Sequence, residues 1–76
     1  MYKTKVTLAL DFISPVGWET KLAELGNTSS TLTATGLVGG QTLHERLWST
    51  QESANAWCAW AITQTDVVSA VVEEVV

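Results

Sequence analysis

Cys58 is the only cysteine of this 76-residue chain, so no disulfide can form within one molecule. A domain of this size buries only about 60% of the surface that its unfolded chain exposes, which leaves a thin margin of stability. Small domains therefore usually add disulfides, a metal ion or a partner subunit. One cysteine and one histidine, His44, fall short of the ligands that zinc requires. By elimination, we expect one domain over residues 1–76, with no cofactor or metal, that forms a homodimer.

The charge of the chain disfavours nucleic acid as a partner. Eight acidic residues outnumber four basic ones, for a net charge of −4. Binding to phosphates needs clustered Lys and Arg, whereas Lys3 and Lys5 are the only local basic pair. No apolar run approaches the length of a membrane span, about 20 residues. Asp11 interrupts the apolar stretch after the basic N-terminus, which disfavours a signal peptide. We expect a cytoplasmic protein with no membrane partner.

The first predicted strand covers residues 3–12, where apolar and polar side chains alternate. A period of two with one apolar face is typical of a half-buried strand. The apolar side carries Val6, Leu8, Leu10 and Phe12. The other side carries Lys5, Thr7, Ala9 and Asp11.

A helix is predicted next, opened by Ser14 as N-cap and Pro15 at its first position. Gly26-Asn27 supplies a left-handed stop. The apolar stripe of this helix consists of Trp18, Leu22 and Leu25.

Residues 31–48 are predicted to form a hairpin that turns at Gly39-Gly40, because a two-residue turn needs positive φ. In this register, one face combines Leu32, Ala34, Gly36 and Val38 with Leu43 and Leu47. The opposite face combines Thr31, Thr33, Thr35 and Leu37 with His44, Arg46 and Trp48. Glu45 is the exception, because it falls among the apolar residues opposite Ala34, and a register shifted by one residue is the alternative.

Ser49-Thr50-Gln51-Glu52 matches a capping box, with Ser49 as N-cap, and predicts a second helix that ends near Thr63. Its buried stripe is Ala54, Trp57, Cys58 and Ala61, flanked by Trp60 and Ile62. Six valines between residues 67 and 76 favour a last strand over a third helix. The resulting order βαββαβ predicts an α+β fold, a four-stranded antiparallel sheet with both helices on one face.

The open sheet face carries the candidate site. His44, Arg46 and Trp48 alternate along one predicted strand, so their side chains project the same way, about 7 Å apart. As a ligand site, Arg46 would bind an anion, His44 would transfer a proton and Trp48 would stack. As an interface, the same face would pair two subunits, since Trp and Arg are enriched there. The further candidate residues for ligand or interface contact are Thr33, Thr35 and Trp60.

We expect a self-associating domain without catalytic activity, which uses the open face as its interface. A small-ligand binder or cofactor-free enzyme that uses His44, Arg46 and Trp48, with His44 as the catalytic candidate, is the first alternative. A module that recruits a different protein through its last strand is the second, since an edge strand accepts a partner strand.

The segment from His44 to Trp57 resembles the second half of dimeric α+β barrel proteins, which include the antibiotic-biosynthesis monooxygenase-like group. It is a strand that ends in an aromatic residue, followed by Ser-Thr-Gln-Glu-Ser-Ala and an aromatic residue one turn later. It also resembles short uncharacterised proteins of phage and marine bacteria. The resemblance implies a ferredoxin-like fold, two sheets packed face to face in a dimer, and a pocket of a cofactor-free monooxygenase near His44, Arg46 and Trp48.

Overall fold

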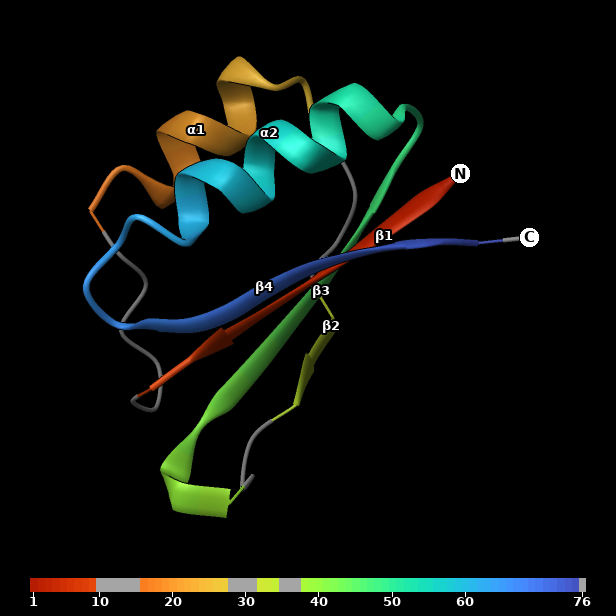
Figure 1. Cartoon of the computed structure of the whole chain (residues 1–76). Coiled ribbons are helices and arrows are strands. Elements are labelled where there is room, and N and C mark those ends of the chain that lie inside the picture. The colour runs from red at the N-terminus through yellow and green to blue at the C-terminus, as the bar shows by residue number, and fades with distance from the viewer. Residues whose placement is uncertain (10–15, 28–31, 35–37, 76) are drawn as a thin grey trace.

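Two helices lie on one side of an antiparallel sheet in the computed structural model, which describes residues 1–9, 16–27, 32–34 and 38–75 (Figure 1). The strands are β1 Tyr2–Leu8, β2 Leu32–Ala34, β3 Thr42–Trp48 and β4 Val67–Glu74. The helices are α1 Trp18–Glu24 and α2 Gln51–Ala61, and a short 3-10 turn, η1, covers Val38–Gly40. The predicted α+β class is confirmed. Within the described ranges, neither helix has the length and apolar character needed to cross a bilayer.

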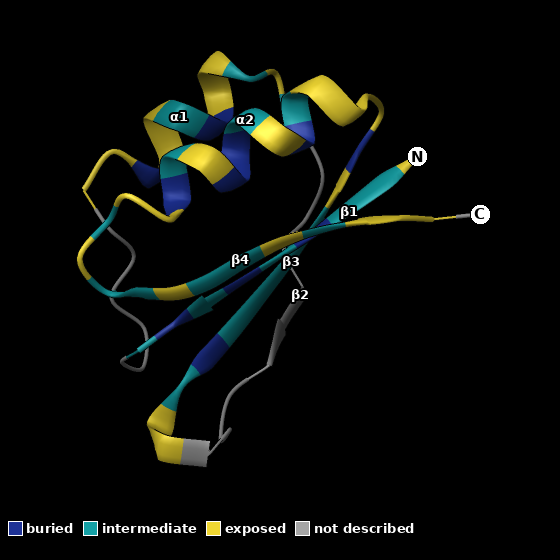
Figure 2. Cartoon of the chain, in the orientation of Figure 1, coloured by how far each residue is buried: buried dark blue, intermediate teal, exposed yellow. Residues whose placement is uncertain are grey.

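The strand β1 lies inside the sheet, between β3 and β4, in the order β2-β3-β1-β4. All three pairings are antiparallel, and β2 contributes three residues that pair with β3. Thr4, Val6 and Leu8 are buried beneath the helices, as Figure 2 shows in dark blue along β1. Lys5 and Thr7 therefore face the other side, as the alternation predicts.

The helix α1 begins later than predicted and ends as predicted. Gly17 adopts φ 90°, a left-handed conformation that a helix does not contain, so α1 begins at Trp18. Val16 and Gly17 form a turn, which makes the predicted start at Pro15 wrong; Ser14 and Pro15 lie outside the described residues.

At the other end of α1, the backbone N–H of Gly26 donates to the Ala23 carbonyl (3.1 Å) and that of Asn27 donates to the Leu22 carbonyl (3.0 Å). Gly26 has φ 71°. These are the two bonds of a Schellman motif, which confirms the predicted stop.

The helix α2 is capped one residue later than predicted. The Thr50 hydroxyl oxygen accepts a hydrogen bond from the Ser53 backbone N–H (3.2 Å), so Thr50 and not Ser49 is the N-cap. Ser ranks above Thr as an N-cap residue, so the intrinsic preference alone does not predict this shift. The stripe is confirmed, since the buried residues of α2 are Ala54, Trp57, Cys58 and Ala61.

The Val-rich segment is a strand, which decides against a third helix. Val67–Glu74 pairs with β1 over its length, with a register irregularity between Thr7 and Leu8. Because β1 lies on one side only, β4 is an edge strand of the sheet.

The predicted faces of β3 are wrong. β1 pairs Val6 with His44 and Thr4 with Arg46, and directly paired residues share a face of the sheet. His44, Arg46 and Trp48 therefore lie beneath the helices, and Leu43, Glu45 and Leu47 face the open side. Trp48 is only 3% exposed, which confirms its place inside.

The pairing of β2 with β3 differs from the predicted register but keeps the predicted grouping of residues by face. Thr33 pairs with His44, and Leu32 pairs with Glu45, two residues away from the predicted register. A shift of two preserves which residues share a face, so the grouping of Thr33 with His44 was right, and only the choice of the covered face was wrong. Instead of a two-residue turn, the chain uses η1, in which Gly39 and Gly40 have φ 76° and 77°. Thr35 lies outside the described residues, as do Leu10, Asp11 and Phe12.

Candidate functional site

A continuous aromatic cluster fills the layer between the helices and the sheet. It consists of the four tryptophans of the chain and His44, and we call it the tryptophan cluster. Trp57 is its centre: its ring centroid lies 4.6 Å from that of Trp18, 6.0 Å from that of Trp48 and 5.4 Å from that of Trp60. The pair Trp57–Trp60 is stacked, whereas Trp18–Trp57 is edge-on. Both arrangements are favourable for aromatic rings.

Trp48 is fixed by a hydrogen bond inside the protein. Its indole Nε1–H donates to the hydroxyl oxygen of Thr4 at 2.8 Å, and Thr4 is completely buried. A buried indole N–H needs an acceptor, and Thr4 on β1 supplies one directly beside β3. Trp48 is therefore held in the core, although it also lines a cavity, and its predicted role in stacking on a ligand stays a prediction.

Arg46 joins the sheet to the end of α1. Its guanidinium Nη1 donates to Asn27 Oδ1 at 2.9 Å, and Asn27 Nδ2 donates to the Leu47 carbonyl at 3.0 Å. Burial lowers the pKa of Arg46, and Glu19 on α1 opposes that effect. Asn27, the residue after the Schellman glycine, thus ties β3 to α1. No sequence pattern predicted this role, because Asn27 matched only a helix stop signal.

His44 packs edge-on against Trp18, with ring centroids 5.3 Å apart. Its Nε2 is buried and has no hydrogen-bond partner among the described residues. Burial, and then the nearby charge of Arg46, lower the pKa of His44. Glu45, its neighbour in the sequence, faces the open side of the sheet, and Asp11 lies outside the described residues. The arrangement favours a neutral imidazole that acts as part of the core.

We expect acid to destabilise the fold through His44. Because its folded pKa is below the unfolded value of about 6.5, the folded state resists protonation and the unfolded state does not. The stability that neutral His44 contributes to the fold is fully present above about pH 6.5, and it is lost as the pH falls through the folded pKa. Urea unfolding between about pH 7.5 and 5.5 measures it, above the range where carboxylates titrate. His44→Gln should flatten this pH dependence; equal slopes in the two proteins would contradict the role of His44.

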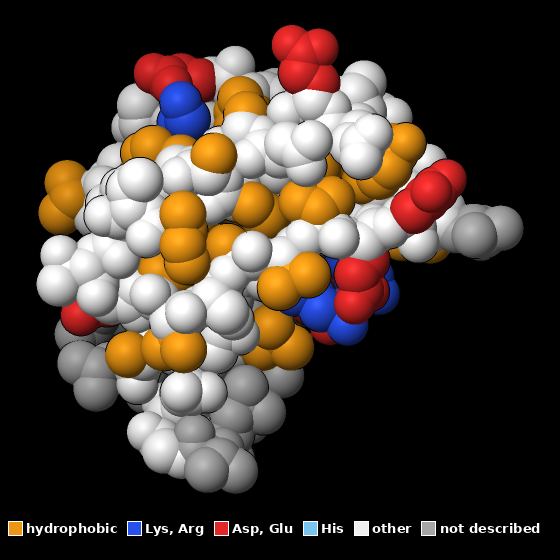
Figure 3. Space-filling view, viewed as in Figure 1, with side chains coloured by type: hydrophobic (Ala, Val, Ile, Leu, Met, Phe, Trp, Pro, Cys, Tyr) orange, Lys and Arg blue, Asp and Glu red, His pale blue; other side chains and the backbone are white. Residues whose placement is uncertain are grey.

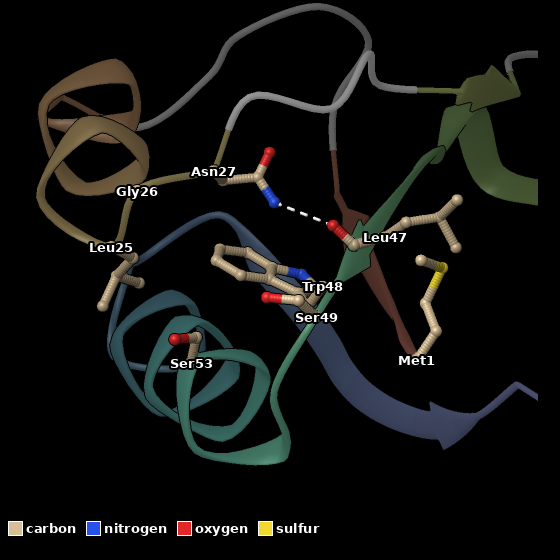
Figure 4. A pocket seen from close by; sticks show the side chains of 8 residues that line it. All are labelled: Met1, Leu25, Gly26, Asn27, Leu47, Trp48, Ser49 and Ser53. Atoms are coloured by element: carbon tan, nitrogen blue, oxygen red, sulfur yellow. Dashed lines mark hydrogen bonds between the residues drawn. The ribbon is translucent and has the colours of Figure 1, made fainter.

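A cavity of about 280 Å³ opens where the end of β3 meets the end of α1 and the start of α2 (Figure 4). Trp48 at the end of β3, Asn27 just after α1 and Ser53 in α2 line it. Its other lining residues are Met1, Leu25, Gly26, Leu47 and Ser49. His44 and Arg46 do not line it, so the structure does not gather the three predicted ligand residues around one space.

Trp60 lines a second hollow, about 250 Å³, between α1 and the end of α2. Gly17 borders it as well, and a Cβ atom at Gly17 would lie 3.6 Å from the Trp60 ring. Trp60 is half-buried and thus both packs in the tryptophan cluster and reaches the surface. This agrees with its predicted place on the flank of the helix.

Cys58 and the carboxylates assemble no reactive centre in the part of the chain that the structure describes. Burial raises the pKa of the Cys58 thiol to about 11, so the thiolate needed for nucleophilic attack is scarce at neutral pH. Among the same residues, no three His, Cys, Asp or Glu side chains are grouped to hold a metal ion.

Comparisons with protein-family models, with curated proteins and with solved structures give no match to this chain.

Proposed function

We propose that the chain is a small, non-catalytic cytoplasmic domain that forms a homodimer by stacking its open sheet face on that of a second copy. The open sheet face comprises Lys3, Lys5, Thr7, Leu43, Glu45, Leu47, Ser69, Val71 and Glu73. We further propose a ferredoxin-like βαββαβ topology. The strand order β2-β3-β1-β4 and the antiparallel pairing of each neighbour support it.

The observation that carries the proposal is the composition of this face. Leu47 is 42% exposed and Val71 is 49% exposed, although both belong to a sheet whose other side is closely packed. Exposed apolar side chains beside polar ones are a feature of protein interfaces. A chain of 76 residues gains stability by covering them.

Charge on the open sheet face is balanced. Lys3 pairs with Glu45 (3.6 Å) and Lys5 pairs with Glu73 (3.1 Å), each pair running diagonally between neighbouring strands. In Figure 3, basic and acidic side chains meet below the strands, on the side away from the helices. Two such faces can therefore approach each other without net repulsion. The Lys and Glu side chains of one copy can then form ion pairs with those of the other.

The rest of the described chain carries the acidic excess. There are five carboxylates and two cations outside the open sheet face, which leaves a net side-chain charge of −3. The carboxylates are Glu19, Glu24, Glu52, Asp66 and Glu74; the cations are Lys21 and Arg46. A face-to-face dimer keeps this like charge away from its interface, which supports the open face over the helical layer.

Leu47→Glu should weaken the dimer, because it places a carboxylate in the interface of both copies. The measurement is the solution mass by light scattering over a concentration series. We expect the dissociation constant to rise about tenfold or more. Ile62→Glu is the matched control, since Ile62 is similarly exposed (50%) but follows α2. Equal masses for the wild type and Leu47→Glu at every concentration would exclude this face as the interface.

Binding of a small ligand in the cavity beside Trp48 is the second candidate, and the space between Asn27, Trp48 and Ser53 is the observation that favours it. The monooxygenase-like alternative needs His44 and Arg46 as well, and these two residues do not line this cavity. A fragment screen by amide NMR tests the candidate. Shifts confined to Ser49, Ser53 and the Trp48 indole would support it, and a screen without such shifts would remove it.

A further inference from the structure

The outer edge of β4, with which no described strand pairs, has the properties of a self-pairing strand. Its eight residues include neither proline nor lysine, the residue types that commonly protect an exposed edge. Val68 is 50% exposed and Val71 is 49% exposed, so apolar side chains accompany the edge. Its charged residues, Glu73 and Glu74, both lie at its C-terminal end, so the part from Val67 to Val72 presents backbone donors and acceptors to another strand.

The pairing with β1 defines which backbone groups are free. The Val75 N–H donates to the Met1 carbonyl (2.9 Å), which continues the register of Tyr2 with Glu74. In an antiparallel pair, residues bond to the neighbour at every second position. Val71 and Glu73 therefore bond towards β1, whereas Ala70, Val72 and Glu74 direct their N–H and C=O groups outward.

We infer that the outer edge of β4 pairs antiparallel with β4 of a second copy of this chain, centred on Val71. In that register Ala70 of each copy bonds with Val72 of the other, and the two Val71 side chains are directly opposite. The contact joins two sheets into one continuous sheet and is separate from the stacking of open faces proposed above.

The distribution of charge favours this register over the one centred on Ala70. Centred on Val71, the pairing sets Glu73 opposite Ser69 and Glu74 opposite Val68, so no acidic residue meets another. A pairing centred on Ala70 would set Glu74 opposite Asp66, a like-charge contact that costs stability. Glu73 is moreover already paired with Lys5 at 3.1 Å within its own chain. An acidic chain can thus pair this edge with itself.

Amide hydrogen exchange by NMR tests the inference on the unmodified protein. The exchange rates of the amides of Ala70, Val72 and Glu74 should be lower in a concentrated sample than in a dilute one. The slowing should reach about tenfold once nine-tenths of the chains are paired, because exchange then occurs from the unpaired tenth. Val71 and Glu73, bonded to β1, provide the internal reference, as they should be protected in both samples. Equal exchange of the three outward amides in both samples would overturn the inference.

Two variants separate the edge from the open face. Ala70→Pro removes one outward N–H and breaks no bond to β1. An edge strand tolerates proline at such a position. Ala70→Thr keeps the N–H and is the control. We expect Ala70→Pro to lose the concentration-dependent slowing at Val72, and Ala70→Thr to retain it.

Leu47→Glu should leave the slowing unchanged, since Leu47 is two strands from this edge. If instead Leu47→Glu abolishes the slowing, the open face is the cause and the edge inference fails. An association lost in Ala70→Pro but intact in Leu47→Glu would support the edge and refute the open face.

Discussion

Replacement of Trp57 by alanine is expected to lower the free energy of unfolding by about 3–5 kcal/mol. Trp57 is 1% exposed and contacts Trp18, Trp48 and Trp60, so its removal leaves a cavity at the point where both helices meet the sheet. A single core in a domain of this size rarely supplies more than about 3–5 kcal/mol, so the variant should be partly or wholly unfolded at 37 °C.

Urea unfolding followed by far-ultraviolet circular dichroism measures this loss. Trp60→Ala is the control, because it deletes the same side chain from the same helix at a half-buried position. We expect a clearly smaller loss for Trp60→Ala. Equal losses in the two variants would show that the tryptophan cluster is not centred on Trp57.

Thr4→Val should have the second largest effect, a loss of about 1–3 kcal/mol. The valine is close in shape to threonine but leaves the Trp48 indole N–H without its acceptor, in a place where both residues are buried. A buried donor that loses its only partner bears the full cost of its desolvation.

Thr4→Ser retains the hydroxyl and loses only a methyl group, which separates the hydrogen bond from packing. A double-mutant cycle with Trp48→Phe completes the test, since phenylalanine has no N–H to satisfy. Thr4→Val should cost less in the Trp48→Phe background than in the wild type. The same cost in both backgrounds would mean that the 2.8 Å hydrogen bond contributes nothing to stability.

Elements whose pattern is decided locally were predicted well. Apolar residues recur every second position in β1 and with the period of a helix in α2, and the buried residues of each element agree with its period. The end of α1 was predicted because Gly26 is the residue type that a Schellman motif requires. The start of α1 was not, because Gly17 was not recognised as a left-handed residue that delays the helix.

The covered face of β3 could not be read from the local pattern. Its two faces have similar apolar content: Leu43 and Leu47 flank Glu45 on one, and Trp48 accompanies His44 and Arg46 on the other. Counting apolar residues favours the leucine face. The structure instead covers the face whose polar groups find partners, Arg46 with Asn27 and Trp48 with Thr4. These partners are 19 and 44 residues away along the chain. The register with β1 brings Thr4 beside Trp48, and the end of α1 brings Asn27 to Arg46.

The candidate site changed with that face. The residue types predicted for a ligand site are present together, but His44 and Arg46 lie in the layer beneath α1 and not on the open side. Thr4 accepts the hydrogen bond of Trp48, and Asn27 accepts that of Arg46. Neither role was predicted, because Thr4 fits a strand and Asn27 fits a turn without any further function. A polar residue in an otherwise apolar strand face, such as Thr4, was the one available signal.

The proximity of the four indoles has a spectroscopic consequence. Rings with centroids 4.6 to 6.4 Å apart exchange excitation among themselves, so the chain emits as one coupled group. That group lies between the helices and the sheet, on the side opposite Lys3, Leu47 and Val71. Intrinsic fluorescence will therefore follow unfolding sensitively and remain nearly silent when two open faces or two β4 edges come together. A change of emission on association would signal that the inner layer itself has rearranged.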